Sequence, residues 1–213
     1  MTLALNCRQC PRLATFLDEV KTVHPDYFAL PVPSFGASGT PFLIVGLAPG
    51  MHGANRTGRP FTGDYAGNLL YGSLHKFGFA TSADPLDMAN NANPELGLKD
   101  CRITNAVRCL PPQNKPEPGE IKQCNSYLVQ ELTMLPHGAA VMALGTIAHQ
   151  AVMMALQLRK TDFAFKHGAQ HSLPNGATLF DSYHCSRYNT QTKRLTTQMF
   201  EDVIASIAAH LEY

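Results

Sequence analysis

The chain has 213 residues, of which 45% are hydrophobic and 15% charged, and its formal net charge is +1. This size fits one α/β domain with a sizeable core, which we expect to span residues 1–213. No run of about 18 apolar residues and no basic N-terminal segment occurs, so neither a membrane span nor a secretory signal is expected. Because the net charge is nearly zero, a nucleic-acid partner would need a local basic surface. We expect a cytoplasmic monomer.

The first predicted element is a helix over residues 11–23, where Leu13, Leu17 and Val20 recur at helical intervals after Pro11. Residues 24–40, rich in Pro and Gly, are interpreted as an ordered surface crossing. Four short apolar runs then predict buried strands, with helical patterns between them and a final helix. The strands are expected at 41–46, 101–107, 139–144 and 177–183, and the helices at about 65–78, 117–133, 145–157 and 193–211.

Strands that alternate with helices predict a three-layer α/β/α sandwich with a central, mainly parallel four-stranded sheet. Ligands of such sheets bind at the carboxyl ends of the strands. Polar or Gly-rich residues follow all four predicted strands, which predicts a site at this edge. They are Gly46 to Pro49, Asn105, Gly145 with Thr146, and His184 to Ser186.

The segment after the first strand, GLAPGMHGANRTGRPFTGD (46–64), carries five glycines and one carboxylate. It lacks the GxxxxGK[ST] pattern of a P-loop and the GxGxxG pattern of a dinucleotide site. It could be a tight turn with solvated arginines, or a loop whose N–H groups after Gly46 bind an oxygen that gains charge in a transition state. Asp64 could cap the helix expected near Tyr65, hold a water or face a developing cation.

Four of the six cysteines form two pairs: Cys7 with Cys10 in a CxxC motif, and Cys109 with Cys124 across fourteen residues. In a cytosolic chain such cysteines more often serve metal or redox chemistry than disulfides. A zinc ribbon would have a tighter second pair, and a thioredoxin-like motif would follow a strand. Four thiolates can also hold a [4Fe–4S] cluster, so zinc and iron–sulfur both stay open. Free buried thiols are expected at the other two cysteines, Cys101 and Cys185.

The segment YHCSRYNTQTKRL (183–195) connects the last strand with the last helix. His184 is either a turn histidine bonded to backbone or a strand-end histidine placed for chemistry. Side chains of the types that contact phosphates follow it, although a charged surface turn has the same composition. They are Arg187, Tyr188, Asn189, Thr190, Lys193 and Arg194.

Taken together, these motifs resemble the uracil-DNA glycosylase superfamily, and most closely its family 5, or type b. The first motif comprises Gly46-Leu47-Ala48-Pro49, Gly53, residues 55–59 and residues 61–64, with Ala48 where several other families have Asp, Asn or Glu. The second is Thr104 to Cys109, and the third is His184-Cys185-Ser186-Arg187-x-Asn189. Cys185 replaces the usual Pro of the third motif, which affects the stiffness of the loop more than its chemistry.

The resemblance implies a monofunctional DNA-repair hydrolase that flips uracil, and other deaminated bases, out of DNA and breaks the N-glycosidic bond. Asp64, Asn105 and His184 are then the catalytic residues: Asp64 stabilises the sugar cation or orients water, Asn105 bonds the base edge, and His184 stabilises the departing base at O2. The implied base-binding residues are Gly46, Leu47, Ala48, Phe61, Asn105 and His184. The implied DNA contacts are Arg56, Arg59, Ser186, Arg187, Asn189 and Lys193. The implied ligands of a structural [4Fe–4S] cluster are Cys7, Cys10, Cys109 and Cys124.

Three alternatives to this interpretation stay open. One is a superfamily member directed to mismatches or hypoxanthine. Another is a module that binds uracil-containing DNA without cutting it, against which the joint presence of Asp64, Asn105 and His184 argues. The third is a zinc-stabilised DNA-binding domain, which metal content would distinguish.

Overall fold

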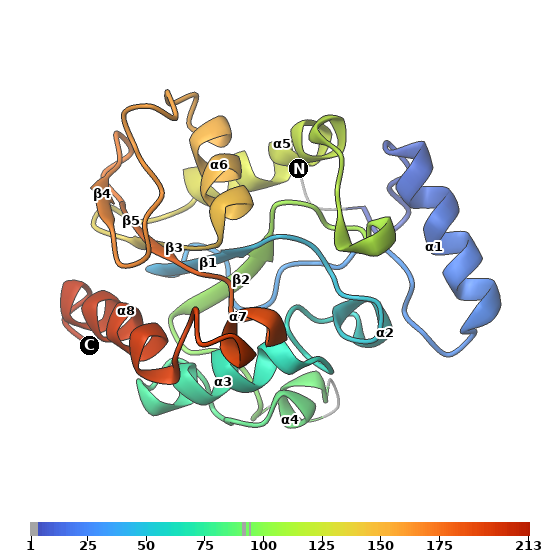
Figure 1. The fold of residues 1–213 in the computed structure, drawn as a ribbon, viewed down its shortest axis with the longest axis horizontal. Helices are drawn as coiled ribbons and strands as arrows, with labels where there is room; N and C mark the ends of the chain where they lie inside the picture. Colours follow the sequence, from blue (N-terminus) through green and yellow to red (C-terminus); the bar gives the residue numbers. More distant parts are fainter. Residues whose placement is uncertain (1–3, 91–92, 94) are drawn as a thin grey trace.

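The computed structural model describes residues 4–90, 93 and 95–213, so the first three residues of the N-terminal stretch lie outside it (Figure 1). A five-stranded sheet in the order β2-β1-β3-β5-β4 forms the centre. The four predicted strands run parallel, and an additional edge strand, β4, is antiparallel to β5. The strands are β1 (Phe42–Gly46), β2 (Cys101–Asn105), β3 (Ala140–Leu144), β4 (Gln170–Ser172) and β5 (Thr178–Ser182). The mainly parallel sheet is confirmed, with one strand more than predicted.

The helices follow the predicted pattern with local differences. They are α1 (Pro11–Val23), α2 (Ala54–Thr57), α3 (Tyr65–Lys76), α4 (Pro85–Ala89), α5 (Pro118–Thr133), α6 (Thr146–Ala155), α7 (Arg187–Gln191) and α8 (Thr197–His210), with a 3-10 turn at Pro112–Asn114. The predicted last helix over 193–211 begins later, because the Thr196 hydroxyl accepts a hydrogen bond from the Met199 amide and caps α8 there. None of the helices in the described ranges is long and apolar enough to cross a membrane.

The sheet is covered by helices on both faces, as predicted (Figure 1). Alternate strand residues such as Ile44 and Phe180 pack against α3 and α8, whereas Val45 and Leu179 pack against α5 and α6. Each fully buried apolar side chain stabilises the fold by about 1.5–3 kcal/mol. Both faces of the central strands are therefore buried, which fixes their register and aligns their carboxyl ends at one edge.

Candidate active site

A pocket of about 430 Å³ lies where β1, β2 and β5 end, and it brings all three sequence motifs together. Eight predicted site residues line it: Leu47, Ala48, Phe61, Asp64, Asn105, His184, Ser186 and Arg187. Five residues that the sequence did not single out also line it: Gly50, Ala54, Tyr65, Ala66 and Asn114. The convergence expected at the strand ends is thus present.

Gly46 ends β1 and lies opposite Asn105 of β2 in the parallel register. A Cβ on Gly46 would lie 2.8 Å from the Phe61 ring and closer still to the Asn105 Oδ1 atom. Hydrogen bonds continue past the strands, because the Ala106 amide donates to the Gly46 carbonyl and the Val107 amide to that of Leu47, both at 2.9 Å. The glycine therefore makes room for two predicted base-binding side chains. The two backbone hydrogen bonds fix the start of the loop after β1 against the loop after β2.

Asp64 is the N-cap residue of α3 by its backbone, yet its side chain makes no cap hydrogen bond. The carboxylate instead lies against the glycine-rich loop, since a Cβ on Gly53 would lie 2.7 Å from Asp64 Cγ and one on Gly50 would lie 3.0 Å from Oδ2. Its Oδ1 atom is buried without a hydrogen-bond partner among the described residues. Burial raises the pKa of Asp64, an effect that the nearby amides of Gly67 and Ala66 oppose. The side chain therefore lines the pocket while it stays close to the first-turn amides of α3.

Phe61 and His184 form an aromatic pair at the pocket, with ring centroids 5.9 Å apart and an interplanar angle of 30°. Phe61 has a φ of 57°, a conformation that is rare for a bulky residue and that concentrates at functional sites. Burial lowers the pKa of His184 to about 4, so its imidazole is neutral near pH 7. The Asn189 side-chain Nδ2 donates to the His184 carbonyl oxygen at 2.8 Å and fixes this turn. His184 is thus a pocket histidine with an aromatic neighbour.

Two side-chain amides line the pocket. Asn105 is 4% exposed, and its Oδ1 atom has no hydrogen-bond partner among the described residues. A buried amide oxygen without a partner is costly, so this atom is available to a ligand donor. Asn114 lines the pocket from the 3-10 turn, where its φ is 57°. The sequence of this Pro-rich loop did not indicate Asn114 as a pocket residue. Its one hint was that Asn tolerates a positive φ.

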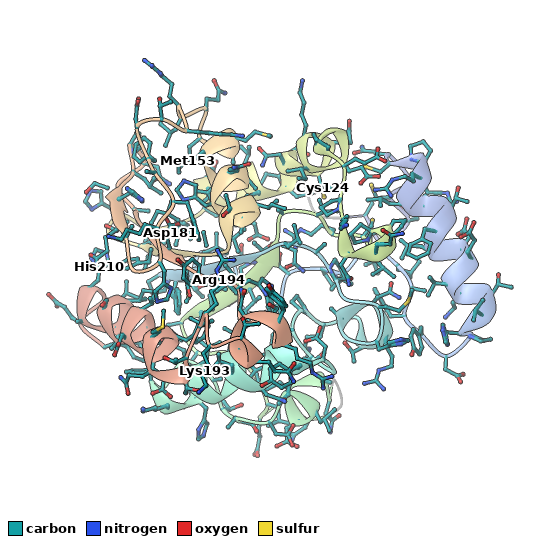
Figure 2. All side chains as sticks on the ribbon, in the orientation of Figure 1. Cys124, Met153, Asp181, Lys193, Arg194 and His210 are labelled. Carbon is teal, nitrogen blue, oxygen red and sulfur yellow. The ribbon has the colours of Figure 1, made fainter. Side chains whose placement is uncertain are left out.

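The predicted DNA contacts divide into exposed cations and residues used within the protein. Arg56, Arg187 and Lys193 are exposed, and the Arg187 guanidinium lies 5.2 Å from the Tyr65 ring centroid at the pocket. Lys193 and Arg194 lie on the segment between α7 and α8, and Figure 2 shows their side chains apart from one another. Ser186 caps α7 by accepting from the Asn189 amide. These DNA roles stay predictions.

Arg59 lies differently from the other predicted DNA contacts. Its guanidinium lies 4.1 Å over the Phe35 ring and donates to the Met88 carbonyl oxygen. Burial lowers the pKa of this arginine. The Arg59 side chain therefore connects the glycine-rich loop to Phe35 and Met88. Its contact with DNA stays a prediction.

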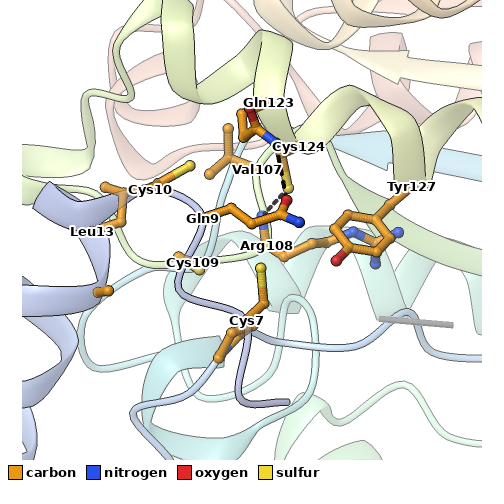
Figure 3. A pocket seen from close by; sticks show the side chains of 12 residues that line it. Cys7, Gln9, Cys10, Leu13, Val107, Arg108, Cys109, Gln123, Cys124 and Tyr127 are labelled. Carbon is orange, nitrogen blue, oxygen red and sulfur yellow. Dashed lines mark hydrogen bonds between the residues drawn. The ribbon is translucent and has the colours of Figure 1, made fainter. Parts of the chain in front are cut away.

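The four paired cysteines meet at a second place, where the N-terminal segment adjoins α5 (Figure 3). Their sulfur atoms face one another, and all four are free thiols. Arg12 of α1 donates to the Glu120 carboxylate of α5 at 2.7 and 2.8 Å, which ties the two cysteine pairs together. The other two cysteines, Cys101 and Cys185, are buried free thiols as predicted.

The chemistry of this sulfur set fits a metal group. Burial is the largest of the effects that raise the pKa of Cys109 to about 12, and nearby Cys124, Cys7 and Cys10 contribute to the same shift. Burial also raises the pKa of Cys10 and Cys124. Four thiolates this close repel one another unless a cationic group lies between them. The Arg108 amide donates to Cys124 Sγ at 3.4 Å, a hydrogen bond that suits a ligating sulfur. The set fits an iron–sulfur cluster and zinc alike.

Known proteins resemble this chain over most of its length. The profile of the uracil DNA glycosylase superfamily matches residues 33–208. A type-5 uracil-DNA glycosylase of Thermus thermophilus is 45% identical, with 93% of this chain and 90% of the relative covered. The type-5 enzyme of Pyrobaculum aerophilum is 37% identical over 96% and 89%, and the type-4 enzyme of that organism is 32% identical over 71% and 61%. The chain belongs to the uracil DNA glycosylase superfamily and, within it, to the type-5 enzymes.

Proposed function

We propose that this protein is a monofunctional DNA glycosylase that hydrolyses the N-glycosidic bond of uracil in DNA and leaves an abasic site. The observation that carries the proposal is the meeting of Phe61, Asp64, Asn105 and His184 at one pocket. An aromatic surface, an unpaired amide, a carboxylate and a neutral imidazole are what recognition and release of a flipped base require. Membership in the type-5 enzymes supports the same activity.

Base recognition falls to Phe61 and Asn105 in this proposal. A base inside the stack cannot reach the pocket, so the nucleotide has to be extruded first. Phe61 then stacks on the base. The Asn105 amide, which offers both a donor and an acceptor, bonds O4 and N3–H of uracil. The unpartnered Oδ1 atom of Asn105 supports this role, because a base N–H would satisfy it.

Bond cleavage needs stabilisation of negative charge on the leaving base and of positive charge on the sugar. The amides near Leu47 and Ala48 and the neutral His184 ring are the donors for the base O2, and removing one such donor costs about 10²–10³ in rate. Asp64 faces the sugar as a carboxylate and stabilises its developing cation or orients the attacking water. Asn114, which lines the same pocket, adds an amide that can hold this water. Ala48 cannot activate water, which leaves the role to these residues.

Cys7, Cys10, Cys109 and Cys124 would hold a [4Fe–4S] cluster in the proposed enzyme. Such a cluster would act as a structural cross-link, and hydrolysis itself requires no electron transfer. It would join the N-terminal segment to the loop after β2 and to α5, which carry the cysteine pairs. A brown protein with about four iron atoms per chain would support the cluster. Stoichiometric zinc in a colourless protein would contradict it.

Uracil cleavage can be tested with a labelled duplex that holds one U opposite G, followed by alkaline cleavage of abasic sites. We expect a product band at the uracil position and none with a matched C:G duplex. Asp64→Asn should retain binding to the U:G duplex while losing most of the product. A wild-type protein that binds U:G without cutting it would replace this proposal with a non-cutting module. Duplexes with hypoxanthine and other deaminated bases then define the range, which we propose to extend beyond uracil.

A further inference from the structure

Three side chains of types that ligate metals meet on the α6 side of the sheet. His149 comes from α6, His171 from β4 and Asp181 from β5 (Figure 2 labels Asp181). Their ligand atoms all lie within 4.8 Å of one another. His149 is 2% exposed, Asp181 is 0% exposed and the His171 side chain is 16% exposed. None of the three lines the pocket of the proposed reaction.

The hydrogen bonds of His149 set its tautomer. Its Nε2 atom lies 2.9 Å from the Phe163 carbonyl oxygen, which can only accept, so Nε2 carries the proton. In the neutral ring, Nδ1 then presents a lone pair, and it lies 2.8 Å from Asp181 Oδ1. An ionised carboxylate is also only an acceptor. Two acceptors at this distance require a cation between them: a second proton fits the 2.8 Å separation, whereas a metal ion requires the two atoms to move apart.

His171 supplies the observation that favours a metal ion. Its Nε2 atom lies 3.4 Å from Asp181 Oδ2, yet it is buried and makes no hydrogen bond to the described residues. A second proton on His149 would leave this nitrogen without a partner. A metal ion between the three side chains would satisfy it together with Nδ1 of His149 and the carboxylate of Asp181. The ion pairs of Asp181 within the described part of the chain are with these two histidines alone.

We propose that His149, His171 and Asp181 bind one divalent transition-metal ion of the zinc class. Two imidazoles and a carboxylate are ligands that zinc prefers, and a ligating histidine usually donates its other N–H to a backbone carbonyl, as His149 does to Phe163. Tetrahedral coordination places donor atoms about 3.4 Å apart, so small side-chain movements complete the site. Water takes the fourth position.

The ion would fasten the segment between α6 and β4 to the strand that leads to the pocket. Phe165 of this segment packs on His149 at 5.7 Å, and the His167 ring stacks on Tyr183 at 5.0 Å. The Tyr183 amide also donates to His167 Nδ1 at 3.1 Å. Asp181 lies on β5, two residues before this tyrosine. The ion would therefore stabilise the fold around the site and take no part in the reaction, so the proposal does not depend on the proposed function.

Metal content and thermal stability test the site on the full chain with its cysteines intact. Zinc and iron are counted by mass spectrometry in the wild type, in His171→Gln and in His75→Gln, a matched control at an exposed histidine of α3. We expect about one zinc per chain in the wild type and the control, none at this site in His171→Gln, and equal metal at the cysteines in all three. Zinc at about 100 times its Kd should raise the Tm of the wild type by about 5–10 °C, an increase that His171→Gln lacks.

Cobalt separates this site from the cysteines without relying on a variant. Co²⁺ bound by imidazole and carboxylate gives visible d–d absorption, whereas Co²⁺ bound by thiolate adds intense charge-transfer bands at shorter wavelength. We expect the d–d bands without a matching rise in the charge-transfer bands. Equal metal content and equal Tm response in the wild type and His171→Gln, or no d–d absorption on Co²⁺ addition, would overturn the proposal. The gap between His149 and Asp181 would then hold a proton.

Discussion

Replacing Gly53 with alanine tests whether the glycine-rich loop exists to make room for the Asp64 carboxylate. A Cβ on Gly53 would lie 2.7 Å from Asp64 Cγ and closer still to Oδ2, whereas ordinary van der Waals contact begins at 3.4 Å. The carboxylate therefore has to move by about 1 Å, and a misplacement of this size costs about 10²-fold in rate. We expect the single-turnover rate of uracil excision to fall by about that factor while DNA binding persists, because the exposed cations Arg187 and Lys193 lie on a different segment.

A graded series of alanine variants separates this effect from a general loss of folding. Gly50→Ala, whose Cβ would lie 3.0 Å from Asp64 Oδ2, should lose less activity than Gly53→Ala. Gly72→Ala of α3, where a Cβ meets nothing within 4 Å, should keep its rate and gain about 0.5–1 kcal/mol of stability. The assay is single-turnover cleavage of a U:G duplex, with Tm measured alongside. A wild-type rate for Gly53→Ala beside an inactive Asp64→Asn would refute the reasoning.

Three further predictions concern pH, base choice and the cysteines. Burial lowers the pKa of His184 to about 4 from 6.5, so only the unfolded chain binds this proton between the two values, and the free energy of unfolding should fall as pH drops through that range. The free energy of unfolding, measured with urea, should depend less on pH in His184→Gln than in the wild type. An identical pH dependence in the two proteins would count against a buried neutral ring. Asn105→Ala should bring the excision rates of uracil and hypoxanthine closer together, and an unchanged ratio would argue against its recognition of the base edge. Cys109→Ser should lose iron and have a lower Tm, whereas Cys101→Ala should keep its iron; equal iron in both variants would exclude Cys109 as a ligand.

The long elements could be predicted because their signals are local. Helix α1 has the bounds that the spacing of its apolar residues predicted, and the apolar runs of β1 and β3 lie within the predicted ranges. Short elements that lack a continuous apolar run, such as β4, α4 and α7, were missed. A segment of that length contains too few residues for a period of 2 or 3.6 to be recognised. The extra edge strand β4 consists of polar residues without a strand-like apolar pattern. Its conformation depends on the pairing with β5.

The sequence by itself determined the alternation of strands and helices, the chemistry at the strand ends and the resemblance to a family. Only the tertiary structure decided that the Asp64 side chain lines the pocket, and that Arg59 lies over Phe35. It also brought Asn114 to the pocket and joined His149 to Asp181. The physical reason is that periodicity and residue type report on neighbours within one element. Distances between side chains from different elements depend on how those elements pack, and no local pattern contains them.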